Sequence, residues 1–169
     1  MSNCGITDLA VLSLDHVNGG GDQERLKFNN KSGILFYTIL KKSGYPDRDK
    51  YQVLCMNCQF KKERRSKILS GNRYSIKSRK YRLYVKNETL SAYGGCKCVR
   101  CDTTDLDILT LDHINGNGSK ERKILGADGS GAKFYQYLKK NGYPDRDKYQ
   151  VLCINCQFKK EFGEFNEQI

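Results

Sequence analysis

Eight cysteines are the residues of this sequence best suited to metal chemistry. Four of them form two CxxC pairs, Cys98 with Cys101 and Cys153 with Cys156. This spacing lets one turn present two thiolates to a tetrahedral ion, so the two pairs together predict a structural Zn²⁺ site. Unpaired buried thiols and a disulfide framework are the alternatives. Because no secretory leader is visible, we favour metal ligands over disulfides.

A second cysteine group is incomplete. Cys55 and Cys58 form a CxxC pair, but upstream only Cys4 matches the other group, and Met1 stands where the other group has its first cysteine. We hypothesise that Cys96, which is otherwise unassigned, completes a four-cysteine zinc site with these three. Three-cysteine coordination with a water ligand, or no metal at all, is the alternative.

Two Asp-His pairs are further candidates for chemistry. The two histidines of the chain, His16 and His113, each follow an aspartate, Asp15 or Asp112, and each precedes a glycine-rich turn. A histidine can act as a general base near neutral pH, and an aspartate carboxylate can bind a hard divalent cation. A duplication would copy a structural Asp-His pair just as faithfully, so the repetition alone does not decide between the two roles.

These groups recur because the sequence contains an internal repeat. Residues 36–63 and 134–161 differ at only four of 28 positions, and LSLDHVNGGG at 12–21 matches LTLDHINGNG at 109–118. Within each copy, the pattern predicts a strand ending at the histidine, a short helix, a second strand and a final helix beginning near the last cysteine. The chain is therefore expected to be a small α+β protein and a covalent pseudo-dimer.

The segment between the copies is strongly basic. Residues 61–90 contain eleven basic and two acidic residues, a net charge of +9 against +11 for the whole chain. We therefore predict three parts: a first unit at 1–63, a basic and helical linker at 64–92, and a second unit at 93–169. A solvated charged helix is the alternative to a nucleic-acid-binding one. The residues predicted to contact nucleic acid are Arg64, Arg65, Lys67, Arg73, Lys77, Arg79, Lys80, Arg82, Lys159 and Lys160.

Composition narrows the classes of protein to consider. The 169 residues suit one domain or two small ones. No run of about 18 apolar residues occurs, so no transmembrane helix is expected. Without a secretory leader we expect an intracellular protein, cytoplasmic or nucleoid-associated.

The order of motifs resembles that of the HNH endonucleases, also called His-Me finger or ββα-metal nucleases. CxxC, then LDH[VI]NG, then VLCxNCxxxK follow one another as in the zinc-stabilised, phage-type branch of that family. The likeness covers residues 93–160 fully and residues 4–62 nearly so. It implies two zinc-stabilised ββα-metal, treble-clef-like units joined by the basic linker, with two structural Zn²⁺ ions and a catalytic Mg²⁺ or Mn²⁺.

The resemblance also implies roles for residues. The histidine would deprotonate the attacking water, and the aspartate before it would bind the catalytic metal ion. The family's second metal ligand, Asn or His, follows the last zinc cysteine, where this chain has glutamine. The implied catalytic residues are thus His113, Asp112 and Gln157, with His16, Asp15 and Gln59 in the first copy.

Gln59 and Gln157 stand where the family has its second metal ligand, and this difference leaves two functions possible. Glutamine offers the same carbonyl oxygen as asparagine but is one methylene longer, and a misplacement near 1 Å can cost about a hundredfold in rate. The expected function is a metal-dependent DNA endonuclease that hydrolyses phosphodiester bonds in double-stranded or branched DNA. The alternative is a catalytically weak or inactive, zinc-stabilised nucleic-acid-binding protein.

Overall fold

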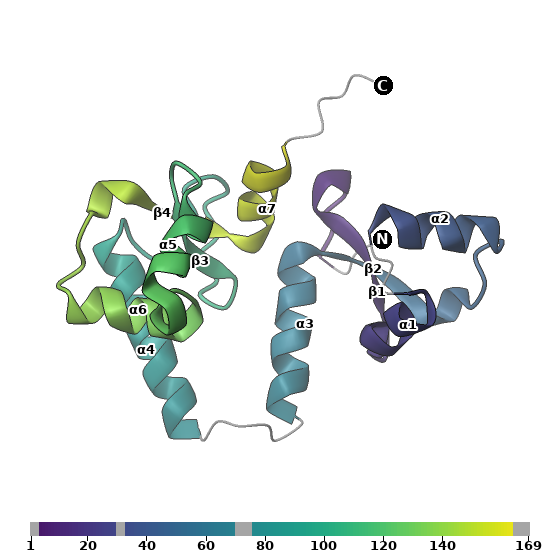
Figure 1. Ribbon diagram of the computed structural model, residues 1–169, viewed down its shortest axis with the longest axis horizontal. Helices are drawn as coiled ribbons and strands as arrows, with labels where there is room; N and C mark the ends of the chain where they lie inside the picture. Colours follow the sequence, from purple (N-terminus) through teal and green to yellow (C-terminus); the bar gives the residue numbers. More distant parts are fainter. Residues whose placement is uncertain (1–3, 30–32, 70–75, 164–169) are drawn as a thin grey trace. The chain divides into compact units, whose positions relative to one another are not determined.

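The computed structural model describes residues 4–29, 33–69 and 76–163. These residues form a small α+β protein with seven α-helices and two two-stranded antiparallel sheets (Figure 1). The small α+β class predicted from the sequence is therefore confirmed. The chain divides into two compact units, Met1–Gln59 and Phe60–Ile169. No helix within the described ranges is long and apolar enough to cross a membrane.

The first unit is built around one β-hairpin. Its strands β1 and β2 are antiparallel, with Leu12 opposite Cys55 and His16 opposite Tyr51. Burial of Val11 and Leu54 gives this unit a small apolar core. Its elements are the short 3-10 turn η1 (Leu9–Val11), β1 (Leu12–His16), α1 (Gly21–Lys27), α2 (Ile34–Lys42), η2 (Arg48–Lys50), β2 (Tyr51–Cys55) and the start of α3 (Met56–Leu69).

The second unit repeats this order of elements and adds a long helix before it. Strands β3 and β4 pair in the same register, with Leu109 opposite Cys153 and His113 opposite Tyr149. In both units the first strand ends at the histidine, as predicted. The elements are α4 (Ile76–Ala92), β3 (Leu109–His113), α5 (Gly118–Leu125), η3 (Gly126–Asp128), α6 (Gly131–Lys140), η4 (Arg146–Lys148), β4 (Tyr149–Cys153) and α7 (Ile154–Phe162).

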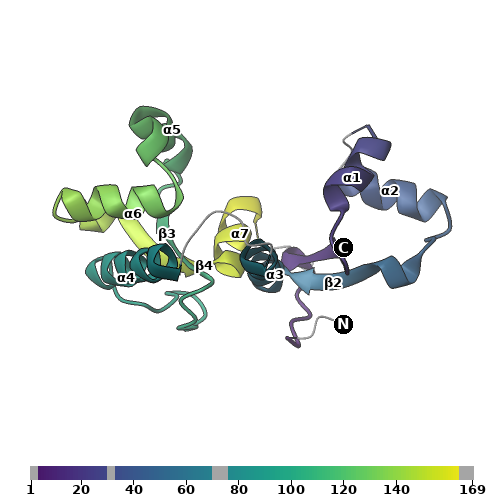
Figure 2. The same ribbon diagram turned by 90° about the horizontal axis from the view of Figure 1, so that it is seen from below.

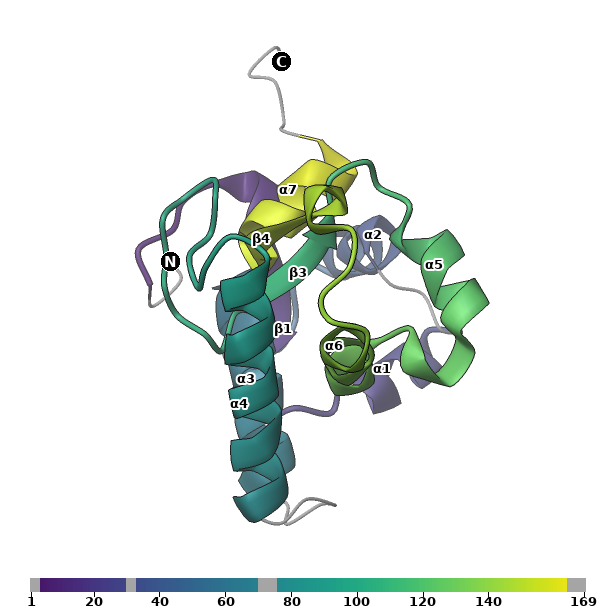
Figure 3. The ribbon, with the colours of Figure 1, turned by 90° about the vertical axis from the view of Figure 1, so that its left-hand side faces the viewer.

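Helix α4 supplies a large part of the second unit's core. It lies beside α6 (Figures 2 and 3). Val85, Thr89 and Leu90 are at most 1% exposed, and at 3.6 residues per turn they span a broad face of about 140° around the helix. Leu90 packs in an apolar cluster with Leu109, Val151 and Leu152.

Within the described part of the predicted linker, residues 64–69 and 76–92 are helical. Residues 64–69 continue α3, and α4 packs into the second unit. The division between the compact units falls between residues 59 and 60. Arg73, one of the residues predicted to contact nucleic acid, lies outside the described residues.

Candidate functional site

The second unit holds a complete four-cysteine group. The Sγ atoms of Cys98, Cys101, Cys153 and Cys156 all lie within 4.8 Å of one another, and those of Cys101 and Cys153 are 3.6 Å apart. Four thiolates about 2.3 Å from a tetrahedral zinc ion lie about 3.8 Å from one another, so the group has the dimensions of a zinc site. The four cysteines predicted together are thus found together. None of the eight cysteines, all of which lie in the described ranges, forms a disulfide bond.

Local backbone structure gathers these thiols. Cys153 ends β4 and caps α7, where its Sγ accepts a hydrogen bond from the Cys156 amide. Burial raises the pKa of the Cys156 thiol, and so do the neighbouring sulfurs. Burial also acts against ionisation of Cys98, but hydrogen bonds from nearby backbone amides outweigh it and lower the pKa of that thiol to about 7. The Cys98 thiol is thus the most easily ionised of those with a shifted pKa, and a divalent cation would favour ionisation of the other thiols.

The first unit holds three thiols in the same arrangement. Cys4, Cys55 and Cys58 lie within 4.8 Å of one another, with 3.5 Å between the Sγ atoms of Cys4 and Cys55. Burial and the two neighbouring thiols raise the pKa of Cys58 to about 12. Such a group can also hold a metal ion. Cys96 belongs to the second unit, where its Sγ donates to Asn87 Oδ1 at 3.1 Å, so its predicted role as a fourth ligand stays a prediction.

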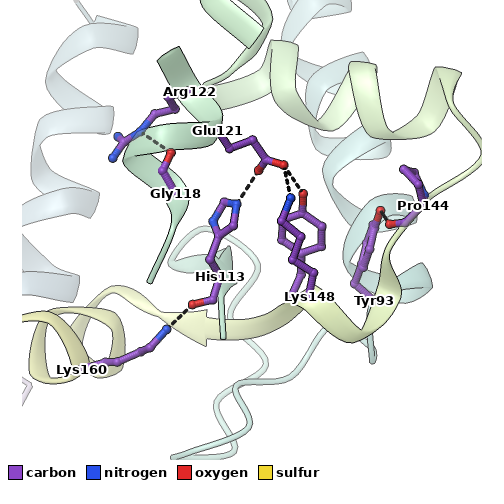
Figure 4. Close-up of polar contacts among 9 residues, drawn as sticks. Tyr93, His113, Gly118, Glu121, Arg122, Pro144, Lys148 and Lys160 are labelled. Carbon is purple, nitrogen blue, oxygen red and sulfur yellow. Dashed lines mark hydrogen bonds and ion pairs between the residues drawn. The ribbon is translucent and has the colours of Figure 1, made fainter. Parts of the chain in front are cut away.

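The histidine that ends β3 is held by a carboxylate. Nε2 of His113 hydrogen-bonds to Glu121 on α5, whose other oxygen accepts from Lys148 and, at 2.8 Å, from the Tyr149 hydroxyl (Figure 4). Burial opposes ionisation of Glu121, but these hydrogen bonds outweigh it and lower the pKa of the carboxyl group. Because an ionised carboxylate only accepts hydrogen bonds, Nε2 carries the ring proton, and Nδ1 is the nitrogen able to take another.

Sequence reasoning did not single out this glutamate. Glu24 plays the same part in the first unit, where it contacts His16 Nε2, Lys50 and Tyr51. A signal was available, since each glutamate stands eight residues after its histidine. The histidine and its glutamate are largely buried: the side chains of His113 and Glu121 are 14% and 17% exposed.

A glycine makes room for the histidine ring. A Cβ atom on Gly118, the first residue of α5, would lie 2.9 Å from Nδ1 of His113. The same position in the first unit, Gly21, would bring a Cβ atom 3.0 Å from Nδ1 of His16. A side chain at either position would therefore press on the nitrogen that remains available.

The aspartate faces the other side of the hairpin. Asp112 Oδ2 accepts hydrogen bonds from Gln150 at 2.9 Å and from the Lys160 ammonium at 2.6 Å. Thr110, on the same strand face, donates to Gln157 Oε1 at 2.9 Å. Asp112 thus contacts α7 through Lys160, and Gln157 on α7 contacts β3 through Thr110, whereas the His113 ring contacts Tyr149.

The first unit repeats these polar contacts. Gln52 donates to Asp15 Oδ2 at 3.0 Å, and Ser13 donates to Gln59 Oε1 at 2.9 Å. The predicted catalytic residues of the two copies therefore share one local arrangement.

The residues predicted to contact nucleic acid differ in exposure and in the side chains they pair with. Arg64 stacks on Phe60 and donates to the Asp107 carbonyl, and Lys160 pairs with Asp112. The side chains of Arg65, Arg79 and Lys80 are exposed, whereas Arg82 and Lys159 are half-buried. Lys67 lies on α3 and Lys77 on α4. The exposed cations could reach phosphate groups, and Lys160 could do so only by sharing its ammonium with Asp112.

Comparison with known proteins gives no relative from which to transfer a function. No family model matches the chain, and no match is found among curated proteins or among solved structures.

Proposed function

We propose that the chain is a metal-dependent DNA endonuclease of the HNH type, with each β-hairpin and the helix that follows it forming a zinc-stabilised ββα-metal unit. The second unit is the better candidate for catalysis, because its frame of four cysteines is complete. Zinc at the thiols would fix the junction of β4 and α7, the two elements that carry Gln150 and Gln157.

The hydrogen bond between His113 and Glu121 carries this proposal. It fixes the imidazole with its proton on Nε2 and directs Nδ1 toward the space that Gly118 leaves. A carboxylate that orients a histidine also stabilises the imidazolium formed when the ring takes a proton from water. Desolvating such a polar network in a small core costs free energy, which favours a functional role over a packing role.

The cation ligands proposed are Asp112 and Gln157. Both hydrogen bonds to Asp112 fall on Oδ2, so Oδ1 is the oxygen that a cation would approach. Gln157 Oε1 accepts one hydrogen bond from Thr110, and a carbonyl oxygen has a second lone pair. Carboxylate and amide oxygens are the ligands that Mg²⁺ and Mn²⁺ prefer. Such an ion would stabilise negative charge on the phosphate and the leaving oxygen.

A second candidate function is binding of nucleic acid without cleavage. The specific observation is the Lys160 ammonium on Asp112, a positive charge beside the proposed metal ligand. Lys160 would then hold a phosphate group as a point charge. The basic residues of α3 and α4 would add affinity that depends strongly on salt.

Nicking of supercoiled plasmid with Mg²⁺ or Mn²⁺ tests the proposal. The intact chain should convert the plasmid to nicked circles. The His113→Ala variant should lose activity by about 10²- to 10⁴-fold, the contribution of a general base. His16→Ala is the matched variant of the first unit. If binding is salt-sensitive and the wild-type chain leaves the plasmid intact with either cation, the second candidate is correct.

A further inference from the structure

The first unit has an open apolar groove. It has a volume of about 460 Å³ and lies between α2 and the hairpin, lined among others by Leu14, Leu40, Tyr45, Tyr51 and Val53. A second hollow continues it along α2. Two residues that line the first groove are large apolar side chains exposed to solvent: Val53 is 38% exposed and Tyr45 is 51% exposed.

The corresponding groove of the second unit is filled. Tyr93, just after α4, packs there against Phe134, Leu138 and Tyr149, and it meets the rings of Tyr143 and Tyr149 edge to face. Leu138, Tyr143 and Tyr149 are the repeat partners of Leu40, Tyr45 and Tyr51. The covering helix therefore explains the difference in exposure: Val151, the partner of Val53, is only 1% exposed.

Polar contacts in the filled groove define what an occupant must offer. The Tyr93 hydroxyl donates to the Pro144 carbonyl at 2.7 Å, and Glu88 pairs with Lys139 on α6. The first unit has Pro46 and Lys41 at these positions. A helix lying on α2 could thus make the same two polar contacts as α4 makes on α6.

We propose that this groove binds an amphipathic helix of a partner polypeptide with the chemistry of α4. Such a helix carries valine, threonine and leucine on one face, an acidic residue near its C-terminal end, and a tyrosine just after it. A second copy of this chain is the less suitable occupant. Its α4 is already buried on its own α6, and releasing it would expose as much apolar surface as it covered.

A labelled peptide with the sequence of residues 76–95 is the probe for this groove. We expect saturable binding of one peptide to the full chain. The peptide and the chain are both strongly basic, so charge attraction cannot account for an interaction between them. A free helix of this length is only marginally stable in water, which will weaken binding but not abolish it.

Two substitutions locate the binding. Val53→Lys places a charge in the groove and should weaken binding about tenfold or more. Because Val53 is partly exposed, the variant should still fold, which circular dichroism checks. Ile34→Lys, at a side chain 79% exposed on α2 that does not line the groove, should leave binding unchanged. A peptide with alanine in place of Tyr93 should also bind at least about tenfold more weakly.

Amide chemical shifts identify the unit that binds. Shifts at Leu40 and Val53 on adding peptide support the proposal. No saturable binding up to about 1 mM peptide, a weak ceiling for a specific site, would overturn it. Equal affinity for the Val53→Lys variant, or shifts confined to Tyr143 and Tyr149 from exchange with the chain's own α4, would overturn it as well.

Discussion

Replacing Glu121 by glutamine should move the proton on His113 from one ring nitrogen to the other. The Lys148 ammonium can only donate hydrogen bonds, so the amide oxygen of the new side chain must face it. The amide NH₂ group then faces Nε2, which must accept and cannot keep its proton. Nδ1 becomes protonated, and the nitrogen proposed as the base is blocked.

The expected size of the effect differs between activity and stability. A wrong tautomer in a carboxylate-oriented histidine costs about 10⁴-fold in rate in the best-known case, so we expect about a thousandfold or more here. Stability should fall less. The change removes charge from hydrogen bonds that are worth about 1.5–3 kcal/mol each in buried sites, but Lys148 is 39% exposed, and we expect a loss of about 1–2 kcal/mol.

Two measurements test this reasoning. Nitrogen-15 NMR of the imidazole should show a proton on Nε2 in the wild-type chain and on Nδ1 in the Glu121→Gln variant, whether or not the chain cleaves DNA. Plasmid nicking gives the rate. Glu24→Gln is the matched variant for His16. Unchanged tautomers in Glu121→Gln would refute the assignment, and an unchanged nicking rate would refute the role of Nδ1.

Metal analysis should find two Zn²⁺ per chain, and Cys153→Ser should lose one and destabilise the second unit, because structural zinc supplies folding free energy; full zinc content in that variant would contradict the site. Gly118→Ala should cut nicking about tenfold or more by displacing the His113 ring, and normal kinetics would refute this crowding. Burial lowers the pKa of Lys86 to about 8 against an ordinary 10.5, so the unfolded chain binds more protons between these pH values and stability should rise with pH there. Urea unfolding should show that rise, of about 3 kcal/mol at most, in the wild-type chain but not in Lys86→Met; parallel pH profiles would contradict it.

The sequence was sufficient for the hairpins and the thiol groups. Near-identity of the two copies fixes which elements recur, and the CxxC spacing places two thiols on one turn at the junction of β4 and α7. The strand ending at His113 followed from apolar residues before a glycine-rich turn. These features are local, so short-range patterns were enough to predict them.

Contacts between distant segments could not be predicted from such patterns. Lys160, which is predicted to contact nucleic acid, also pairs with Asp112, 48 residues away. Glu121 reaches His113 only because α5 turns back over the strand end. Helix α4 was expected to be a connector because of its charge, yet the burial of Val85 and Leu90 makes it part of the core. In each case tertiary packing, rather than composition, decides the partner.

Cleavage of supercoiled DNA by the double variant His16→Ala, His113→Ala tests the central claim most directly. The wild-type chain should nick the plasmid only when Mg²⁺ or Mn²⁺ is present. The double variant, with its zinc content unchanged, should be at least about a hundredfold less active. Nicking by the double variant at the wild-type rate would contradict the claim.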